Sequence, residues 1–241
     1  MLRSFPYKCA LAVAALLAMA GPVAAGAITV DNPSFETQPA GGLTGAGCGA
    51  GCSYAENENI PGWTISDSTG LTYQIIPGVQ DGNYAYDNYV PNGVTVAGVE
   101  GQADGISQTV AATAVSGATY TLTVNTGRVA NCCLFGPLID LVVGSNAIAA
   151  TGSEPGYGNW AVWTASFTAL HGDAGDPITI ELGSTGVYTG DGDTTTDASF
   201  DEVQLSETIG VPEPTIWALM IGGLCSIGWA LRTARRRALA A

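Results

Sequence analysis

The sequence predicts an all-β protein built as a jelly-roll β-sandwich, and three of its features point to this fold class. Apolar residues alternate with threonine and other polar residues in several short segments, which is the pattern of half-buried strands. Groups of Gly, Pro, Asn and Asp separate these segments as turns would. Between the two chain ends, no segment shows the 3.6-residue apolar repeat of an amphipathic helix.

Five segments show the strand pattern most clearly, and all of them lie in the middle of the chain. They are residues 106–110, 118–124, 138–143, 163–167 and 178–182. The segment 138–143 is apolar except for Asp140, which is typical of a central strand. Sandwiches of this length fold as one unit, so we expect a single domain over residues 28–208.

Three phrases, taken in their order along the chain, carry a family resemblance. They are Asn-Pro-Ser-Phe-Glu at 32–36 with Ile-Pro-Gly-Trp at 60–63, Gly-Ile-Ser-Gln at 105–108 with Gly-Ala-Thr-Tyr-Thr-Leu at 117–122, and Ser-Phe-Asp-Glu-Val-Gln-Leu at 199–205. Together they resemble the galactose-binding-like jelly roll, the sandwich of many carbohydrate-binding modules. The resemblance covers most of residues 30–206 and implies a domain that binds or supports polysaccharide.

The closing phrase places a carboxylate on an apolar face. Asp201 shares the period of two with Val203 and Leu205, so we expect its side chain to point into the core. A buried carboxylate needs a compensating partner, and calcium is suited to this because it takes oxygen ligands. The resemblance implies a structural calcium held by Glu36 and Asp201, where the first and last strands meet. The alternative is that Asp201 accepts backbone N–H bonds at a strand end.

A second acidic segment, residues 191–197, begins like an EF-hand loop. Glu202 falls at its twelfth position, but Thr196 stands at the sixth, where the sharp turn needs glycine. Strands rather than helices are predicted around it. We therefore expect a solvated acidic loop here, with weak calcium binding left open.

The charge of the chain is very uneven and excludes some partners. All 21 Asp and Glu residues lie between Asp31 and Glu213, and Arg128 is the one Lys or Arg among them. Acidic residues therefore exceed basic ones by 20 in this stretch. Such a surface repels phosphate backbones and anionic membranes, so we expect no nucleic-acid partner. It attracts divalent cations.

Enzyme motifs are missing from the sequence, so we expect a protein that is not an enzyme. His171 is the single histidine, and it lies in a predicted turn. No Gly-x-Ser-x-Gly, phosphate-binding glycine loop or histidine cluster is present. A polysaccharide hydrolase with two paired carboxylates is the less favoured alternative, because so many acids bring some pair together by chance.

Aromatic residues among polar loops suggest a surface for sugar rings. We name Tyr84, Tyr86 and Trp160 as ligand-binding candidates, with Tyr84 and Tyr86 on one face if their segment forms a strand. The alternative is that such residues only pack. We expect packing rather than binding for Trp63 and Trp163.

Four cysteines lie within the predicted domain, namely Cys48, Cys52, Cys132 and Cys133. An even number in an exported chain favours disulfides, and three pairings are open. We favour bonds that tie the first pair to the second, because a bridge between the adjacent Cys132 and Cys133 is strained. A four-cysteine zinc site is the alternative, although these spacings fit a zinc ribbon badly.

The N-terminal residues 1–27 have the order of a secretory signal peptide. Arg3 and Lys8 form a positive region, an apolar run follows, and small residues after Pro22 supply a cleavage site. We expect export through the Sec translocon and cleavage by signal peptidase.

The chain end combines a proline motif, an apolar run and an arginine cluster. Residues 215–231 are uncharged, which predicts a single transmembrane helix with the arginines on the cytoplasmic side. The motif is Val211, Pro212, Glu213 and Pro214, and the cluster includes Arg235, Arg236 and Arg237. In this order, residues 211–237 resemble the PEP-CTERM sorting signal of Gram-negative bacteria.

The PEP-CTERM resemblance implies an exosortase, a membrane protease or transpeptidase, as the partner that processes the chain near its Pro-Glu-Pro. It implies a protein that crosses the inner membrane, is anchored there, and then reaches the cell surface or extracellular matrix. We therefore expect a non-catalytic binding or structural component of an exopolysaccharide or biofilm layer. The alternative is a calcium-stabilised structural surface protein without a sugar site.

Overall fold

The computed structural model describes residues 25–46, 51–56, 59–66, 71–77, 86, 90–101, 105–130, 133–186, 196–209, 220–228, 232 and 235. The chain divides into a compact unit over residues 25–208 and a second unit formed by the two chain ends. In the second unit, residues 220–228 are helical. Of the helices that the described residues form, none has the length and apolar character needed to cross a membrane.

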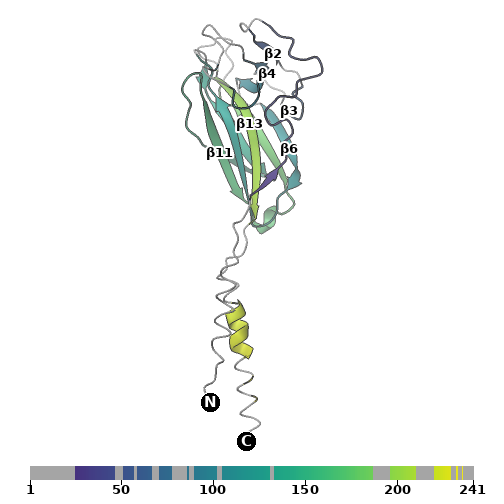
Figure 1. Ribbon diagram of the computed structural model, residues 1–241, viewed down its shortest axis with the longest axis vertical. Coiled ribbons are helices and arrows are strands. Elements are labelled where there is room, and N and C mark those ends of the chain that lie inside the picture. Colours follow the sequence, from purple (N-terminus) through teal and green to yellow (C-terminus); the bar gives the residue numbers. More distant parts are fainter. Residues whose placement is uncertain are drawn as a thin grey trace. The chain divides into compact units, whose positions relative to one another are not determined.

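The first unit is a sandwich of two β-sheets (Figure 1). The first sheet has the order β11 (Trp160–Thr168), β7 (Ala118–Gly127), β13 (Thr196–Ile209), β5 (Val96–Glu100), β4 (Leu71–Ile76) and β2 (Ser53–Glu56), with β1 (Gly26–Ile28) and β8 (Leu134–Phe135) also paired to β13. The second sheet has the order β10 (Asn146–Ala149), β9 (Pro137–Val143), β12 (Pro177–Ser184), β6 (Ile106–Thr113) and β3 (Thr64–Ile65). A short 3-10 helix, η1, spans His171–Asp173.

The predicted all-β sandwich is confirmed at the level of its strands. All five segments with a strand pattern lie in strands, and the closing phrase lies in β13. Strand pairs in both sheets, such as β11 with β7 and β12 with β9, are antiparallel. The architecture is jelly-roll-like, while the closer resemblance to galactose-binding-like domains stays a prediction.

The period of two builds the core between the sheets. On β7, Tyr120, Leu122 and Val124 are fully buried and alternate with half-buried threonines and Asn125. On β12 of the facing sheet, every second residue from Ile178 to Leu182 is buried in the same way. Each such aliphatic side chain contributes about 1.5–3 kcal/mol when it leaves water.

The phrases noted in the sequence meet at a junction between segments that are distant along the chain. The Trp63 Nε1–H donates to the Asn32 carbonyl at 3.2 Å, and the Trp63 ring lies 5.4 Å from that of Phe35. The Gln108 amide on β6 donates to the Gly62 carbonyl at 2.7 Å. Trp63 is 4 % exposed, which confirms its expected packing role.

We expect Gln108→Ala to lower the free energy of unfolding by about 2–4 kcal/mol, because it removes three hydrogen bonds to the backbone of Asp31 and Gly62. Gln108 also accepts from the Asp31 N–H at 2.8 Å and donates to its carbonyl at 2.9 Å. Urea unfolding measures the change, with Gln204→Ala at an exposed site of β13 as the control. Equal losses in the two variants would contradict a special role for Gln108.

Candidate active site

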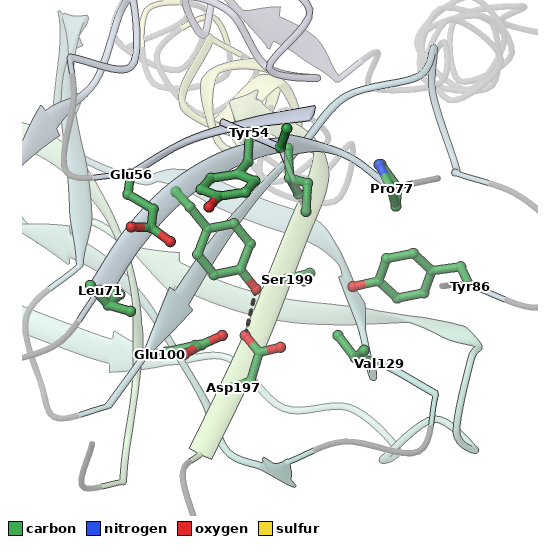
Figure 2. A pocket seen from close by; sticks show the side chains of 12 residues that line it. Tyr54, Glu56, Leu71, Pro77, Tyr86, Glu100, Val129, Asp197 and Ser199 are labelled. Carbon is green, nitrogen blue, oxygen red and sulfur yellow. Dashed lines mark hydrogen bonds between the residues drawn. The ribbon is translucent and has the colours of Figure 1, made fainter. Parts of the chain in front are cut away.

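A cavity of about 290 Å³ opens on the first sheet, on the side away from the core (Figure 2). Side chains from β2, β4, β5 and β13 and from three loops form its walls. The lining residues are Ala46, Tyr54, Glu56, Leu71, Tyr73, Ile75, Pro77, Tyr86, Glu100, Val129, Asp197 and Ser199. This volume lies near the lower end of the range for small-molecule sites.

The acid at the centre of this cavity is Asp197, near the start of β13. Ala198 and Phe200 belong to the core cluster, so the alternation of the strand turns Asp197 and Ser199 toward the cavity. Asp197 is only 5 % exposed. Its Oδ1 accepts a hydrogen bond of 2.9 Å from the Tyr73 hydroxyl on β4, drawn as a dashed line in Figure 2.

A glycine on the strand between them lets Tyr73 reach Asp197. In the sheet register Gly98 on β5 stands opposite both Tyr73 and Ser199. A Cβ atom on Gly98 would lie 2.1 Å from the Tyr73 ring, so the ring occupies the space that any side chain would need. The missing side chain therefore orients the tyrosine.

Burial and negative charge make Asp197 an acid near neutral pH. Burial raises the pKa of Asp197 to about 7, the charge of Glu100 adds to the increase, and hydrogen bonds from Tyr73 and the Ala198 backbone oppose it. Burial also raises the pKa of Tyr73 well above its usual value, so its phenol remains a donor. A carboxyl group with a pKa near 7 suits general acid catalysis.

Two more carboxyl groups line the cavity without a basic neighbour. Glu100 stands directly opposite Asp197 in the register of β5 and β13, and Glu56 comes from the end of β2. Burial raises the pKa of Glu100, and the charge of Glu56 adds to this. Arg128 is engaged elsewhere: it pairs with Glu154 and lies 3.7 Å over the Tyr157 ring. None of the lining residues is basic.

The predicted aromatic candidates differ in their positions. Tyr86 lines the cavity, whereas Trp160 lies behind it, with ring centroids 4.4 Å apart. Both rings pack over Gly127, where a Cβ atom would lie 2.7 Å from Tyr86. Trp160 is not among the lining residues, and Tyr84 lies outside the described part of the chain. Burial raises the pKa of Tyr86 well above its usual value.

The two predicted calcium ligands meet at one loop. The Glu36 Oε1 accepts bonds from the Val94 and Thr95 N–H groups at 2.8 and 2.7 Å. The Asp201 carboxylate accepts bonds of 2.7 Å from the N–H groups of Asn92 and Glu202. Burial raises the pKa of Asp201 to about 7, with smaller increases from the charges of Glu202 and Glu36.

The expected side of Asp201 needs a correction. Asp201 is fully buried, as expected, but Phe200 before it already faces the core, as do Val203 and Leu205 after it. Glu202 has a positive φ of 49°, and the core-facing residues change there from even to odd numbers, as at a β-bulge. By alternation from Phe200, Asp201 falls on the side of Asp197.

Several predicted sites are only partly described. Cys52 and Cys133 are both disulfide-bonded, whereas Cys48 and Cys132 lie outside the described residues, so their pairing stays a prediction. Arg235 is helical and exposed. The signal peptide up to residue 24 and most of the sorting signal, namely Val211, Pro212, Glu213, Pro214, Arg236 and Arg237, also lie outside those residues.

Asp197 is the residue that sequence reasoning missed. The sequence predicts a solvated acidic loop here, but β13 begins at Thr196 and Asp197 is buried. The usable signal was the polar row of Asp197, Ser199 and Asp201, which alternates with apolar Ala198 and Phe200. Its partner Tyr73 is 124 residues away, beyond any local pattern.

We expect Asp197→Asn to make the protein more stable relative to wild type as the pH rises from about 4 to 7. Between the ordinary pKa of 3.8 and the folded value of about 7, the folded state holds the extra proton. Wild type therefore loses stability across this window, and the gain of the variant levels off above it at roughly 2–4 kcal/mol.

Urea unfolding at a series of pH values measures this difference. Glu181→Gln, at an exposed position of β12, is the control and should follow the wild-type curve. Asp201 leaves some pH dependence in the Asn variant, because its pKa is also about 7. Parallel curves for wild type and Asp197→Asn would refute the assignment.

Comparison with known proteins identifies relatives of this sandwich. The family model for HpiC1 cyclase matches residues 26–206. The Stig cyclase Fisc from Fischerella sp. TAU, solved with (3Z)-3-(1-methyl-2-pyrrolidinylidene)-3H-indole, is 19 % identical, with a TM-score of 0.60 over 78 % of this chain and 100 % of that chain. An apo cyclase from Fischerella sp. is 20 % identical, with a TM-score of 0.59 over 79 % and 100 %. No curated protein matches.

A second complex from Fischerella sp. TAU, a cyclase with 4-(1H-indol-3-yl)butan-2-one, is 18 % identical, with a TM-score of 0.58 over 77 % of this chain and 100 % of that chain. At such identities the structures show a shared fold. The matching family is one of cyclases. The expectation that the protein is not an enzyme is therefore wrong. The expectation of a non-catalytic component of a polysaccharide or biofilm layer is wrong for the same reason. This chain belongs to the HpiC1 cyclase family.

Proposed function

We propose that this chain is a cyclase that closes a ring by acid catalysis, with Asp197 as the proton donor. The observation that carries the proposal is the position of Asp197 in the cavity, where burial gives it a pKa of about 7 and Tyr73 holds it at 2.9 Å. Membership in a cyclase family supports ring closure as the reaction class. General acid catalysis of this kind contributes about 10²–10⁴-fold to a rate.

The proton transfer requires no other reactant. The Asp197 O–H bond breaks as the proton joins one end of a double bond in the substrate, which leaves an electron-poor carbon at the other end. An electron-rich double bond of the same molecule attacks this carbon and forms the ring bond. Loss of a proton to the Asp197 carboxylate then restores the acid, so the product is an isomer of the substrate.

The cavity walls favour the positive charge that arises in this step. The carboxyl groups of Glu56 and Glu100 line the cavity with no basic residue beside them. The faces of Tyr54, Tyr73 and Tyr86 supply additional negative potential, since aromatic rings attract cations. Such fixed groups stabilise a transition state without reorganising during the reaction.

Indoles with a short side arm are the substrate class that we propose. Two of the similar cyclases from Fischerella sp. TAU are solved with indole compounds. The cavity here has flat aromatic walls and apolar contacts from Leu71 and Ile75, which suit a ring of that size and shape. The substrate itself is unassigned, so a panel of alkenyl-substituted indoles is the appropriate probe.

We expect Asp197→Asn to lower kcat for ring closure at least 100-fold, because the amide cannot donate an acidic proton. Product formation from the alkenyl-indole panel is followed by NMR in D2O, where deuterium enters at the protonated position. The wild-type rate should fall as the pH rises above about 7. Glu181→Gln serves as the control, and full activity in Asp197→Asn would overturn the proposal.

We also propose that Glu36 and Asp201 contribute to a structural calcium site. The two acids lie near one another, and this supports the proposal. Both accept hydrogen bonds from the loop of residues 92–95, and the charge of Glu36 raises the pKa of Asp201. No third Asp, Glu, His or Cys completes a metal cluster among the described residues. Backbone carbonyls and water would supply the remaining oxygens, as calcium accepts both.

We expect excess calcium to raise the Tm of wild type by roughly 5–10 °C, since saturation near 100 Kd stabilises a protein by about 2.7 kcal/mol. Asp201→Asn should abolish this increase, whereas Asp197→Asn should keep it. Differential scanning calorimetry with and without EDTA measures the effect. An unchanged Tm of wild type in EDTA would exclude the site.

Export remains a proposal from the chain ends alone. The order of residues 1–27 supports passage through the inner membrane, and that of residues 211–237 supports processing by an exosortase. Most of these residues lie outside the unit of residues 25–208, and they bear on where the enzyme is located.

A further inference from the structure

The first strand of the sandwich begins where the signal peptide is expected to end. β1, purple in Figure 1, consists of Gly26, Ala27 and Ile28 and runs antiparallel to the last part of β13. Two bonds in the sequence satisfy the small-x-small requirement of signal peptidase, one after Ala25 and the other after Ala27. The two choices differ by two residues of β1, so the structure of this strand distinguishes between them.

Cleavage after Ala27 would damage the contact of β1 with the core. The side chain of Ile28 is half-buried against the core cluster, and in the register it stands opposite Leu205, which is 2 % exposed. If Ile28 became the first residue, β1 would lose the paired residues Gly26 and Ala27. The new ammonium group would then lie at an apolar position, where a charge without a partner is costly.

Cleavage after Ala25 has the opposite consequences. All of β1 remains, and the new ammonium group belongs to Gly26, which stands opposite Glu207 in the register. Residues directly opposite on antiparallel strands have Cβ positions about 4.5–5.5 Å apart, a distance that a glutamate side chain can bridge. A Cβ atom on Gly26 would lie 3.9 Å from the Glu207 carbonyl oxygen, which shows how near the two residues are.

Glu207 is suited to receive this cation. Its Oε1 accepts a hydrogen bond of 2.9 Å from the hydroxyl of Tyr120, whose ring belongs to the core, so the carboxylate is held in place. In the part of the chain that the structure describes, the one ion pair joins Arg128 to Glu154, and Glu207 has no basic partner. A positive charge on Gly26 would therefore meet an acid that no other cation occupies.

We propose that signal peptidase cleaves the chain between Ala25 and Gly26, and that the ammonium group formed on Gly26 pairs with Glu207. The inference rests on the proposed export and ends the signal peptide at residue 25 rather than 27. Hydrolysis breaks the peptide bond between Ala25 and Gly26. Water gives its hydroxyl to the Ala25 carbonyl carbon, and the Gly26 nitrogen keeps the bonding electrons and takes up protons. Processing thus adds a cation to a domain in which Arg128 is the single Lys or Arg.

The cleavage point is tested on the full-length chain, produced with its signal peptide in a Gram-negative host. Mass spectrometry of the N-terminal peptide should find Gly26 as the first residue. Signal peptidase needs a small residue directly before the bond it cleaves, so Ala25→Gln should abolish the Gly26 N-terminus. Ala27→Gln, at an exposed position of β1, is the matched control and should preserve it. An N-terminus at Ile28 in wild type would overturn the assignment.

The ion pair is tested by acetylating the α-amino group of the processed protein, which removes the charge and keeps every residue of β1. Lys8 is the one lysine of the chain and leaves with the signal peptide, so no lysine competes for the reagent. We expect the Tm to fall by about 2–4 °C, the shift for one ion pair in a domain of this size.

Two glutamate variants locate the effect of acetylation. Glu207→Gln should abolish the difference in Tm between free and acetylated protein, while its amide oxygen still accepts from Tyr120. Glu181→Gln removes the same charge from an exposed position of β12 and should leave the difference unchanged. This control separates the pairing with Glu207 from the general acidity of the surface.

The outcomes distinguish this inference from the proposed export and from catalysis. If residues 1–25 stay attached to the protein, both the cleavage and the export are refuted. An N-terminus at Ile28 overturns the cleavage point alone and leaves the export standing. If Gly26 is first but acetylation leaves the Tm unchanged, or if Glu207→Gln keeps the difference, the ion pair is overturned. Ring closure by Asp197 is measured separately and stands in each case.

Discussion

The hydrogen bond between Tyr73 and Asp197 is the interaction on which the proposed chemistry of this protein depends. It joins β4 to β13 across β5, so it exists only when β13 is in register with two strands that lie far before it in the sequence. The same alternation that buries Ala198 and Phe200 in the core turns Asp197 to the cavity. The hydrogen-bonded pair of Tyr73 and Asp197 therefore forms together with the sheet.

The scarcity of basic residues gives the sandwich its electrostatic character. Most proteins neutralise buried carboxylates with Lys or Arg, and here only Arg128 is present in the domain, pairing with Glu154. Desolvation is consequently the largest influence on the pKa of both Asp197 and Asp201, and it favours the protonated form. An acidic composition thus raises the pKa of interior carboxyl groups, and for Asp197 this supports the proposed role as a proton donor.

The strands and the core followed from local patterns, whereas the site did not. A period of two marks β7 and β12 because each strand meets one apolar and one polar environment along its own length. Local alternation places Asp197 on the polar side of β13, but it does not show the contacts of Asp197 with Tyr73 and Glu100 on other strands. The sequence contains no catalytic motif, yet the family is one of cyclases. A single carboxyl group whose pKa is raised by burial requires no characteristic spacing of residues. The sequence also does not show that the core-facing residues change from even to odd numbers at Glu202, because a β-bulge leaves the number of apolar residues unchanged.

Gly98 shows how a position without a side chain can set the geometry of a candidate active site. The Tyr73 ring fills the space beside Gly98. The depth of the cavity and the direction of the phenol therefore depend on the absence of a side chain at this position. A search for functional groups would pass over this residue, yet even a methyl group there would push the tyrosine away from the acid. The shape of the cavity can therefore be changed from a position that contributes no functional group of its own.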